Sequence, residues 1–282
     1  ARPRADFQRP CDMVVRQEPG EAVSEEVRSA FIVYFSQTGN TEQVAEAVGR
    51  GLRGRGVKVK MARLLEADPQ EAAECDVLGL GTPVFYYKEP ILVRRFIGRL
   101  PVARRKPAFT FITHGGNPVN TLARMQKHLA RRGYTVVNSF SCHGYDSYPM
   151  FLRVFRQWGA PTAEDLRDAE AFGERLPSEC RWFREEPRFA LPRYRFVGGK
   201  YFLFSLLFSG RRMKRFFPAQ KVNESLCKQC GLCVRNCPAR AIRLAPYPQV
   251  SDACIWCYLC ERICPWQAFE VDWSGLRKRM HV

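Results

Sequence analysis

The sequence lacks a long apolar segment and has few acidic residues, and both shortages limit what the chain can be. Its longest strongly apolar run, residues 201–208, is far shorter than the roughly 20 residues of a membrane-spanning helix. The amino-terminal segment has charge but no apolar core after it, so no secretion is expected. There are 28 acidic residues against 45 lysines and arginines, a formal net charge of +17. We expect a globular cytoplasmic protein whose basic surface attracts anionic partners.

Three nucleotide-binding signatures are also missing. The loop 36–41 contains no lysine, which disfavours a nucleoside triphosphate site of the Walker type. Gly49, Gly51 and Gly54 do spell GxGxxG, but they close a predicted helix and precede a strand, whereas a dinucleotide fingerprint follows a strand and opens a helix. No nucleic-acid motif accompanies the basic residues. We therefore expect neither a nicotinamide site nor nucleic-acid binding.

The cysteines fall into two groups. Cys11, Cys75, Cys142 and Cys180 are scattered without a pairing pattern, which favours reduced thiols over disulfides. The other eight form two copies of CxxCxxCxxxCP that begin 27 residues apart. Such a loop wraps three thiolates around one iron–sulfur cube and takes the fourth from elsewhere. A pair of zinc sites is the alternative, disfavoured because zinc needs no crossing cysteine. The predicted metal ligands are Cys227, Cys230, Cys233, Cys237, Cys254, Cys257, Cys260 and Cys264.

Residues 221–274 resemble the bacterial two-cluster ferredoxin domain. The resemblance implies two [4Fe-4S] clusters, each completed by the last cysteine of the other motif. Cluster one would then take Cys227, Cys230, Cys233 and Cys264, and cluster two would take Cys237, Cys254, Cys257 and Cys260. Trp256 and Tyr258 occupy positions that are often small, and we expect them to exclude water from cluster two. Lys228 should raise the reduction potential of cluster one.

The sequence before the cysteine motifs has a different pattern. Short apolar runs alternate with segments of helical period, which predicts a doubly wound parallel sheet of α/β class with a smaller α+β ferredoxin-type domain after it. In a flavodoxin-like order, 2-1-3-4-5, ligand binds at the carboxyl ends of the strands. The predicted strands are 30–35, 57–64, 75–85, 106–116 and 134–142, and the helices are 41–52, 89–100, 121–133 and 162–176.

The loop SQTGNT lies between the first strand and the first helix. Backbone N–H groups and the helix dipole make this an anion site, and its hydroxyls add neutral donors. The motif resembles the (S/T)xTGxT phosphate loop of flavodoxins, and the resemblance spans residues 30–176. It implies FMN, bound by three loops. The predicted cofactor-binding residues are Ser36, Gln37, Thr38, Gly39, Asn40, Thr41; Thr82, Pro83, Val84, Phe85, Tyr86, Tyr87; and Thr113, His114, Gly115, Gly116, Asn117.

Aromatic residues of the second loop have two interpretations. Phe85, Tyr86 and Tyr87 either stack on the flavin ring or pack between helix and sheet. The third loop would offer backbone donors to the ring, and its histidine, His114, is either a proton source for the flavin or simply a hydrogen-bonding residue. Both alternatives stay open at the level of sequence.

Two segments belong to neither unit. Residues 1–29 form an irregular extension whose role is open, and residues 188–220 combine basic and aromatic residues without an acidic one. The second segment either lies on an anionic membrane surface or packs the two units together, and we favour packing. The expected domains are therefore 30–187, with FMN, and 221–282, with the clusters.

The whole chain resembles the fused flavodoxin/ferredoxin proteins of anaerobic bacteria and archaea, generally regarded as donors to low-potential enzymes. The resemblance implies an electron carrier that couples the one-electron clusters to the two-electron flavin and donates to a low-potential enzyme. Its basic charge predicts a redox partner with an acidic docking face. The alternative is an FMN-dependent reductase of a quinone, porphyrin precursor or disulfide, fed by the clusters. Partner, direction of flow and oligomeric state are left open by the sequence.

Overall fold

The computed structural model describes residues 26–146 except 117 and 119, residues 159–186 and residues 217–280. Most of the amino-terminal extension and of the basic aromatic segment therefore lies outside the described residues. So does Asn117, the last of the predicted cofactor-binding residues.

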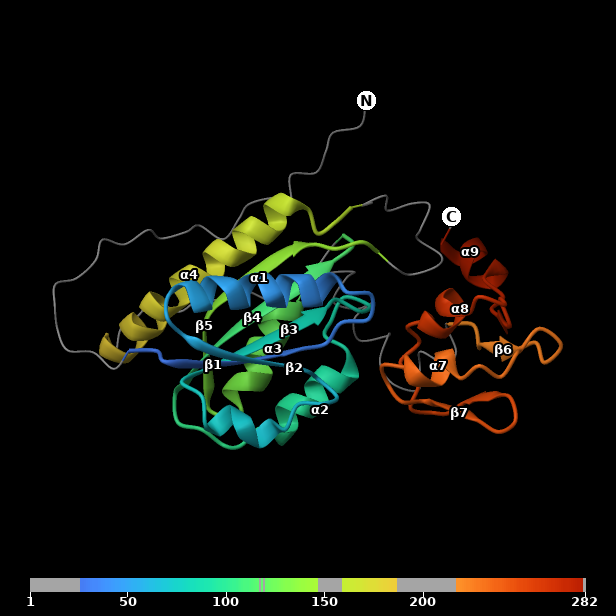
Figure 1. The fold of residues 1–282 in the computed structure, drawn as a ribbon, viewed down its shortest axis with the longest axis horizontal. Helices are drawn as coiled ribbons and strands as arrows, with labels where there is room; N and C mark the ends of the chain where they lie inside the picture. Colours follow the sequence, from blue (N-terminus) through green and yellow to red (C-terminus); the bar gives the residue numbers. More distant parts are fainter. Residues whose placement is uncertain (1–25, 117, 119, 147–158, 187–216, 281–282) are drawn as a thin grey trace, which may run out of the picture.

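Five parallel strands form the larger sheet, in the order β2-β1-β3-β4-β5 (Figure 1). This confirms the predicted flavodoxin-like α/β fold. Strands β1, β3 and β4 are almost wholly buried, as expected of apolar runs covered on both faces. The strands are β1 (Ser29–Tyr34), β2 (Lys58–Arg63), β3 (Val77–Pro83), β4 (Lys106–His114) and β5 (Tyr134–His143).

Two pairs of helices cover the sheet. Helices α1 (Asn40–Gly54) and α4 (Ala163–Glu185) lie on one face, and α2 (Ile91–Arg99) and α3 (Thr121–Ala130) lie on the other (Figure 1). A short 3-10 helix, η1 (Pro69–Ala73), was not expected from the sequence. The two apolar layers hold the carboxyl ends of the strands at one edge, where the three predicted FMN loops emerge.

Helix α4 is longer than predicted. Thr162 and Asp165 form the expected capping box at its start, but the helix continues through Pro177 to Glu185 instead of ending at residue 176. Cys180 is fully buried and Phe183 is 3% exposed. The burial of these two side chains offsets the hydrogen bond that proline removes, so tertiary packing overrides the local signal.

Gly51, one of the glycines that spell GxGxxG, has a packing role. Helix α1 ends at Gly54, as expected of glycines that close a helix. A side chain at Gly51 would collide with the backbone of Glu170, and one at Gly173 would collide with the backbone of Val48. Helices α1 and α4 therefore approach backbone to backbone, and only glycine permits this distance.

The carboxyl-terminal unit consists of short elements around two cysteine motifs. Its pairs of strands are antiparallel, β6 with β9 and β7 with β8. Residues 27 apart share the left-handed backbone region, namely Gln229 with Trp256 and Gly231 with Tyr258, so the two motifs repeat one conformation. The elements are β6 (Lys221–Val222), α7 (Leu232–Arg235), β7 (Ile242–Leu244), β8 (Pro248–Val250), α8 (Leu259–Ile263), β9 (Phe269–Glu270) and α9 (Ser274–Met280).

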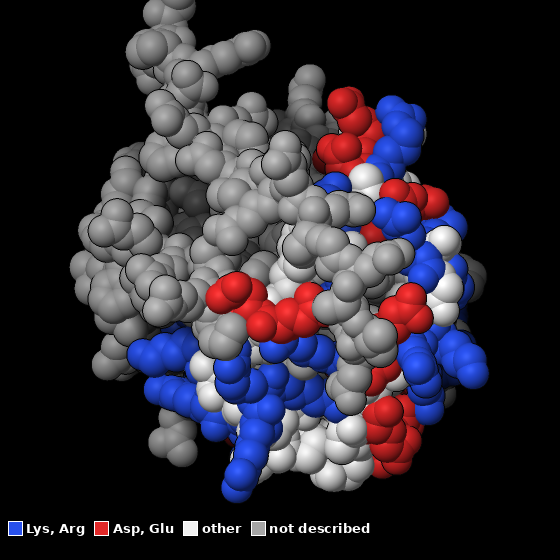
Figure 2. Space-filling model, turned by 90° about the vertical axis from the view of Figure 1, so that its left-hand side faces the viewer, with Lys and Arg blue, Asp and Glu red and all other residues white. Residues whose placement is uncertain are grey.

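The basic charge is unevenly spread over the surface. Figure 2 views the side opposite the ferredoxin-type unit and shows lysines and arginines gathered on its lower part, with acidic side chains above and beside them. Arg99 and Arg104 are exposed near the end of α2 and in the turn before β4. This end of the sheet lies away from the three loops and from the cysteine motifs (Figure 1).

None of the helices in the described part of the chain is long and apolar enough to cross a membrane.

Candidate functional site

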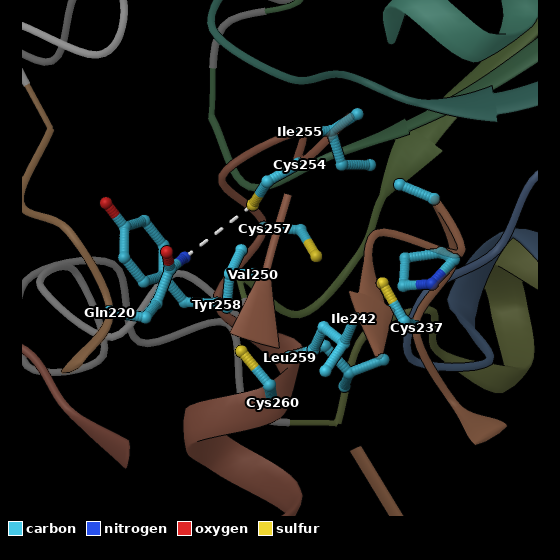
Figure 3. A pocket seen from close by; sticks show the side chains of 12 residues that line it. Gln220, Cys237, Ile242, Val250, Cys254, Ile255, Cys257, Tyr258, Leu259 and Cys260 are labelled. Atoms are coloured by element: carbon cyan, nitrogen blue, oxygen red, sulfur yellow. Dashed lines mark hydrogen bonds between the residues drawn. The ribbon is translucent and has the colours of Figure 1, made fainter. Parts of the chain in front are cut away.

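Two cavities in the carboxyl-terminal unit are each surrounded by four cysteines. The first, which we call the Cys257 cavity, is lined by Cys237 together with Cys254, Cys257 and Cys260. Figure 3 shows these four side chains pointing toward one space from separate segments of the chain. The last cysteine of the first motif therefore joins the first three of the second, the combination that the resemblance implies.

The second cavity repeats this arrangement with the roles of the motifs exchanged. This Cys230 cavity is lined by Cys264 together with Cys227, Cys230 and Cys233. Cys230 is exposed, whereas its counterpart in the other motif, Cys257, is only partly exposed. The structure thus brings all eight predicted ligands together in two sets of four.

Backbone N–H groups surround the sulfurs in matching positions. The N–H groups of Gln229 and Trp256 donate to the Sγ atoms of Cys227 and Cys254, each at 3.4 Å. Those of Ala241 and Ala268 donate to the last cysteine of each motif, at 3.2 and 3.4 Å. Such donors stabilise the negative charge of thiolates and tune the potential of a cluster bound by them.

Burial controls the thiols of the Cys257 cavity. It raises the pKa of Cys257 to about 12 and also raises the pKa values of Cys254 and Cys260. Buried thiols are neutral on their own, and coordination to a metal deprotonates them. Four cysteines around one cavity fit a group that takes one sulfur at each corner.

The predicted phosphate loop lies at the amino end of α1. Gly39 has φ 90° and no side chain caps the helix, so the first N–H groups face the loop without a side-chain acceptor. Ser36 Oγ accepts from the Gly39 N–H at 3.1 Å, and the buried Thr41 hydroxyl lies 2.8 Å from that of Thr113 in the third loop. Loop one and loop three are thus tied together, and the free helix end fits the phosphate of FMN.

The second loop is divided between the core and the interface of the two units. Phe85 packs edge-on against Phe35 with ring centroids 6.0 Å apart, as in the packing interpretation. Tyr86 donates from its hydroxyl to the carbonyl of Trp256 at 2.6 Å, and its ring lies 4.6 Å from that of Phe217. Tyr86 and Tyr87 both have positive φ, a strained backbone that the surrounding contacts maintain.

A pair of histidines occupies the edge of the third loop. His114 and His143 are register partners at the ends of β4 and β5, and their ring centroids are 4.7 Å apart. Burial, followed by the neighbouring His143, lowers the pKa of His114 to about 4. His114 is therefore neutral at pH 7 and offers an N–H donor rather than a positive charge. Sequence reasoning missed His143, because only strand register places it beside His114.

The backbone of the third loop is closely packed on one side. A side chain at Gly115 would collide with Asp146, whereas Gly116 faces open space. Asn40 of the first loop donates to the carbonyl of Tyr145 at 3.0 Å. The three loops and the segment after β5 therefore form one connected rim at the carboxyl ends of the strands.

Glu89 closes the second loop through a buried ion pair. Its carboxylate accepts two hydrogen bonds from Arg124, at 2.9 and 3.1 Å, and lies 3.3 Å from His128 Nε2. Burial by itself would raise the pKa of Glu89, but the bonds from His128 and Arg124 lower it below its ordinary value of 4.5. Because the folded pKa is depressed, this contribution to stability is present above pH 4.5 and is lost as the pH falls through the folded value.

Removal of Arg124 tests how much the ion pair with Glu89 contributes to the free energy of unfolding. We expect Arg124→Met to lower the free energy of unfolding by about 3–5 kcal/mol, because it leaves a buried carboxylate unpaired. Urea unfolding at pH 7, followed by circular dichroism, measures the change. Arg131→Met, which removes an exposed arginine just after the same helix, is the control and should change stability by less than about 0.5 kcal/mol. Equal losses in the two variants would contradict the assignment.

The two units share a core and direct hydrogen bonds. Ile255, between two cysteines of the second motif, is 7% exposed and belongs to the apolar cluster beneath the larger sheet. Gln37 of the phosphate loop donates to the carbonyl of Cys257 at 2.9 Å. Cys257 and Ala239, which line the Cys257 cavity, also pack against this same cluster. The Cys257 cavity therefore adjoins the phosphate loop.

Comparison with known families agrees with this architecture. The flavodoxin family model matches residues 32–158, and the model of the 4Fe-4S binding domain matches residues 221–243. A flavodoxin domain implies FMN, and a 4Fe-4S binding domain implies at least one 4Fe-4S cluster. The two together define an electron-transfer flavoprotein in general. The chain joins a flavodoxin domain to a ferredoxin-type domain, which is the composition of a fused flavodoxin/ferredoxin protein.

Individual proteins similar to this chain match about half of it. The uncharacterized protein MJ0298 of Methanocaldococcus jannaschii is 22% identical over 155 residues, which are 52% of this chain and 97% of that protein. A flavodoxin from the domain Archaea is 21% identical with a TM-score of 0.43, covering 54% of this chain and 98% of its own. The flavodoxin of Megasphaera elsdenii is 24% identical with a TM-score of 0.40, covering 51% and 98%.

Proposed function

We propose that this protein is an electron carrier that holds one FMN and two [4Fe-4S] clusters in a single folded unit. The hydrogen bond from Gln37 to the carbonyl of Cys257 carries the proposal, because it joins the phosphate loop to a predicted cluster ligand. Electrons then pass between FMN and the group in the Cys257 cavity. The group in the Cys230 cavity is the outer member of the chain.

Each cofactor has its own set of residues. The eight cysteines of the two cavities hold the clusters, and the first helix turn with Ser36, Thr38 and Thr41 holds the phosphate of FMN. Gly115 and Gly116 let the third loop approach the flavin ring, while Phe85 packs against Phe35 and Tyr86 bonds to the backbone of Trp256. When bound, FMN exchanges two electrons in total and the clusters exchange one each.

The residues between the sites exclude water from the route. Tyr258 is fully buried, donates to the carbonyl of Pro218 at 2.8 Å and packs against Trp273 with ring centroids 4.5 Å apart. Tyr86, Phe217 and Trp256 belong to the same apolar cluster. A dry, closely packed contact supports transfer inside the molecule.

Cofactor analysis of the anaerobically purified protein tests the proposal. We expect about eight irons, about eight sulfides and one FMN per chain, from four cysteines at each cube and one phosphate loop. Four irons would leave one cavity without a cluster, and zinc in place of iron would overturn the proposal. The reduced protein should pass electrons to a redox protein faster than to quinones or disulfides; turnover of a small substrate at enzyme-like rates would favour a reductase instead.

A further inference from the structure

The cysteine motif that faces away from the flavodoxin domain is surrounded by exposed apolar and basic side chains. Leu226 is 43% exposed and Trp266 is 50% exposed, and Cys230 itself is exposed. Lys228 lies over the ring of Trp266, with Nζ 6.0 Å from the ring centroid. Arg235 donates to the carbonyl of Cys230 at 3.0 Å. We call these five residues the Trp266 patch.

The two cysteine cavities differ in what covers them. Residues of the Cys257 cavity also pack against the core of the flavodoxin domain, whereas none of the residues lining the Cys230 cavity belongs to that core. Exposed tryptophan and leucine beside an exposed metal ligand are unusual on a surface that has no partner, because large apolar side chains at such places mark interaction sites. The Cys230 cavity is thus the side from which another protein reaches the chain of cofactors.

The charge of the patch selects the kind of partner. Lys228 is the only charged residue among those that line the Cys230 cavity, and Arg235 adds a second positive charge beside Cys230. Glu224 adjoins the patch in sequence and leaves it basic overall. A basic rim around an apolar centre steers an acidic protein toward the cavity and repels a basic one.

We propose that the Trp266 patch is the docking surface for an acidic electron-transfer protein, which exchanges single electrons with the group held by Cys227, Cys230, Cys233 and Cys264. The inference rests on the proposed function and adds the place and the charge of the partner. In the forward direction, one electron leaves the reduced cluster and reduces one oxidised metal centre of the partner. No proton or bond changes hands in the step.

Equal charge reversals at two places on the surface separate the effect of this patch from the general basicity of the protein. The test variant is Lys228→Glu with Arg235→Glu, and the control is Arg99→Glu with Arg104→Glu, which makes the same change of net charge at the far end of the sheet. The probes are rubredoxin, a small acidic one-iron protein, and cytochrome c, a basic one. Full-length protein is reduced with dithionite and mixed anaerobically with either oxidised probe in a stopped-flow instrument.

The test variant should lose about tenfold or more of its rate with rubredoxin at low ionic strength, and it should gain rate with cytochrome c. Calorimetric titration of the oxidised protein with oxidised rubredoxin should show weaker binding for this variant, a readout that needs no electron transfer. The control should stay within about twofold of the parent in both assays. Trp266→Ser should weaken the same binding without a change of charge.

Equal losses in the test and control variants, or no loss in either, would overturn the docking surface. Its failure is distinguishable from a failure of the proposed function. Iron and flavin analysis, and oxidation of the reduced protein by methyl viologen at the parental rate, show whether the clusters are intact in each variant. If they are intact and rubredoxin ignores the patch, the internal electron route stands and the surface does not.

Discussion

Cys237→Ala is expected to remove the same cluster as Cys257→Ala, although Cys237 belongs to the other sequence motif. The reason is that Cys237 lines the cavity of Cys254, Cys257 and Cys260. Both variants should retain about four irons per chain, and their remaining clusters should give the same electron paramagnetic resonance spectrum. Cys264→Ala should in turn match Cys230→Ala, because these two residues line the other cavity.

The four variants together form an internal control. If each motif held its own cluster, Cys237→Ala would match Cys230→Ala, and the pairs of spectra would exchange. The assignment therefore needs no reference spectrum from another protein. A Cys75→Ala variant, which removes a cysteine that lines neither cavity, should keep its full content of about eight irons per chain. Loss of iron in that variant would indicate a general effect of cysteine removal.

Ile255→Ala is expected to uncouple the clusters from the flavin without removing either cofactor. Ile255 is buried in the apolar cluster of the flavodoxin domain, and truncation of such a side chain costs about 2–5 kcal/mol. Each 1.4 kcal/mol changes an equilibrium about tenfold. The ratio of docked to undocked protein, and with it the rate of flavin reduction by the clusters, should fall by about tenfold or more.

Flash reduction of the clusters, followed by absorbance of the flavin, measures this internal step. The matched control is Leu244→Ala, because Leu244 is 38% exposed in the ferredoxin-type domain and belongs to none of the four apolar clusters of the described residues. Gln37→Ala removes the bond to Cys257 from the flavodoxin side, and its smaller loss of about 1 kcal/mol should slow the step less. If Ile255→Ala keeps its full cofactor content and its flavin is reduced at the parental rate, the clusters do not reduce the flavin through this contact.

Local patterns predicted the elements of the larger sheet and their order. The strands follow from apolar runs bounded by turn residues, and Thr162 with Asp165 marks the start of α4 correctly. The predicted end of α4 at residue 176 was wrong. Pro177 disfavours a helix only locally, whereas the burial of Cys180 and Phe183 depends on packing with distant parts of the chain. A proline cost is exceeded wherever enough apolar area lies beyond it.

The contacts between the domains could not be predicted for the same reason. Gln37 and Cys257 are 220 residues apart in sequence, and no periodicity relates them. Ile255 lies between two cysteines of a metal-binding motif, yet it fills part of the core of the other domain. Tyr86 was a candidate for stacking on the flavin, but its hydroxyl contacts the backbone of Trp256. Motif spacing describes what each site binds, while packing determines which sites meet.

The close approach of α1 and α4 has a consequence for protein synthesis. The helix that presents the phosphate loop is held by Gly173, a residue made more than a hundred positions later in translation. A nascent chain that ends before α4 leaves the backbone of Val48 and the apolar face of α1 open to water. We therefore expect the phosphate loop to bind flavin only after α4 has left the ribosome.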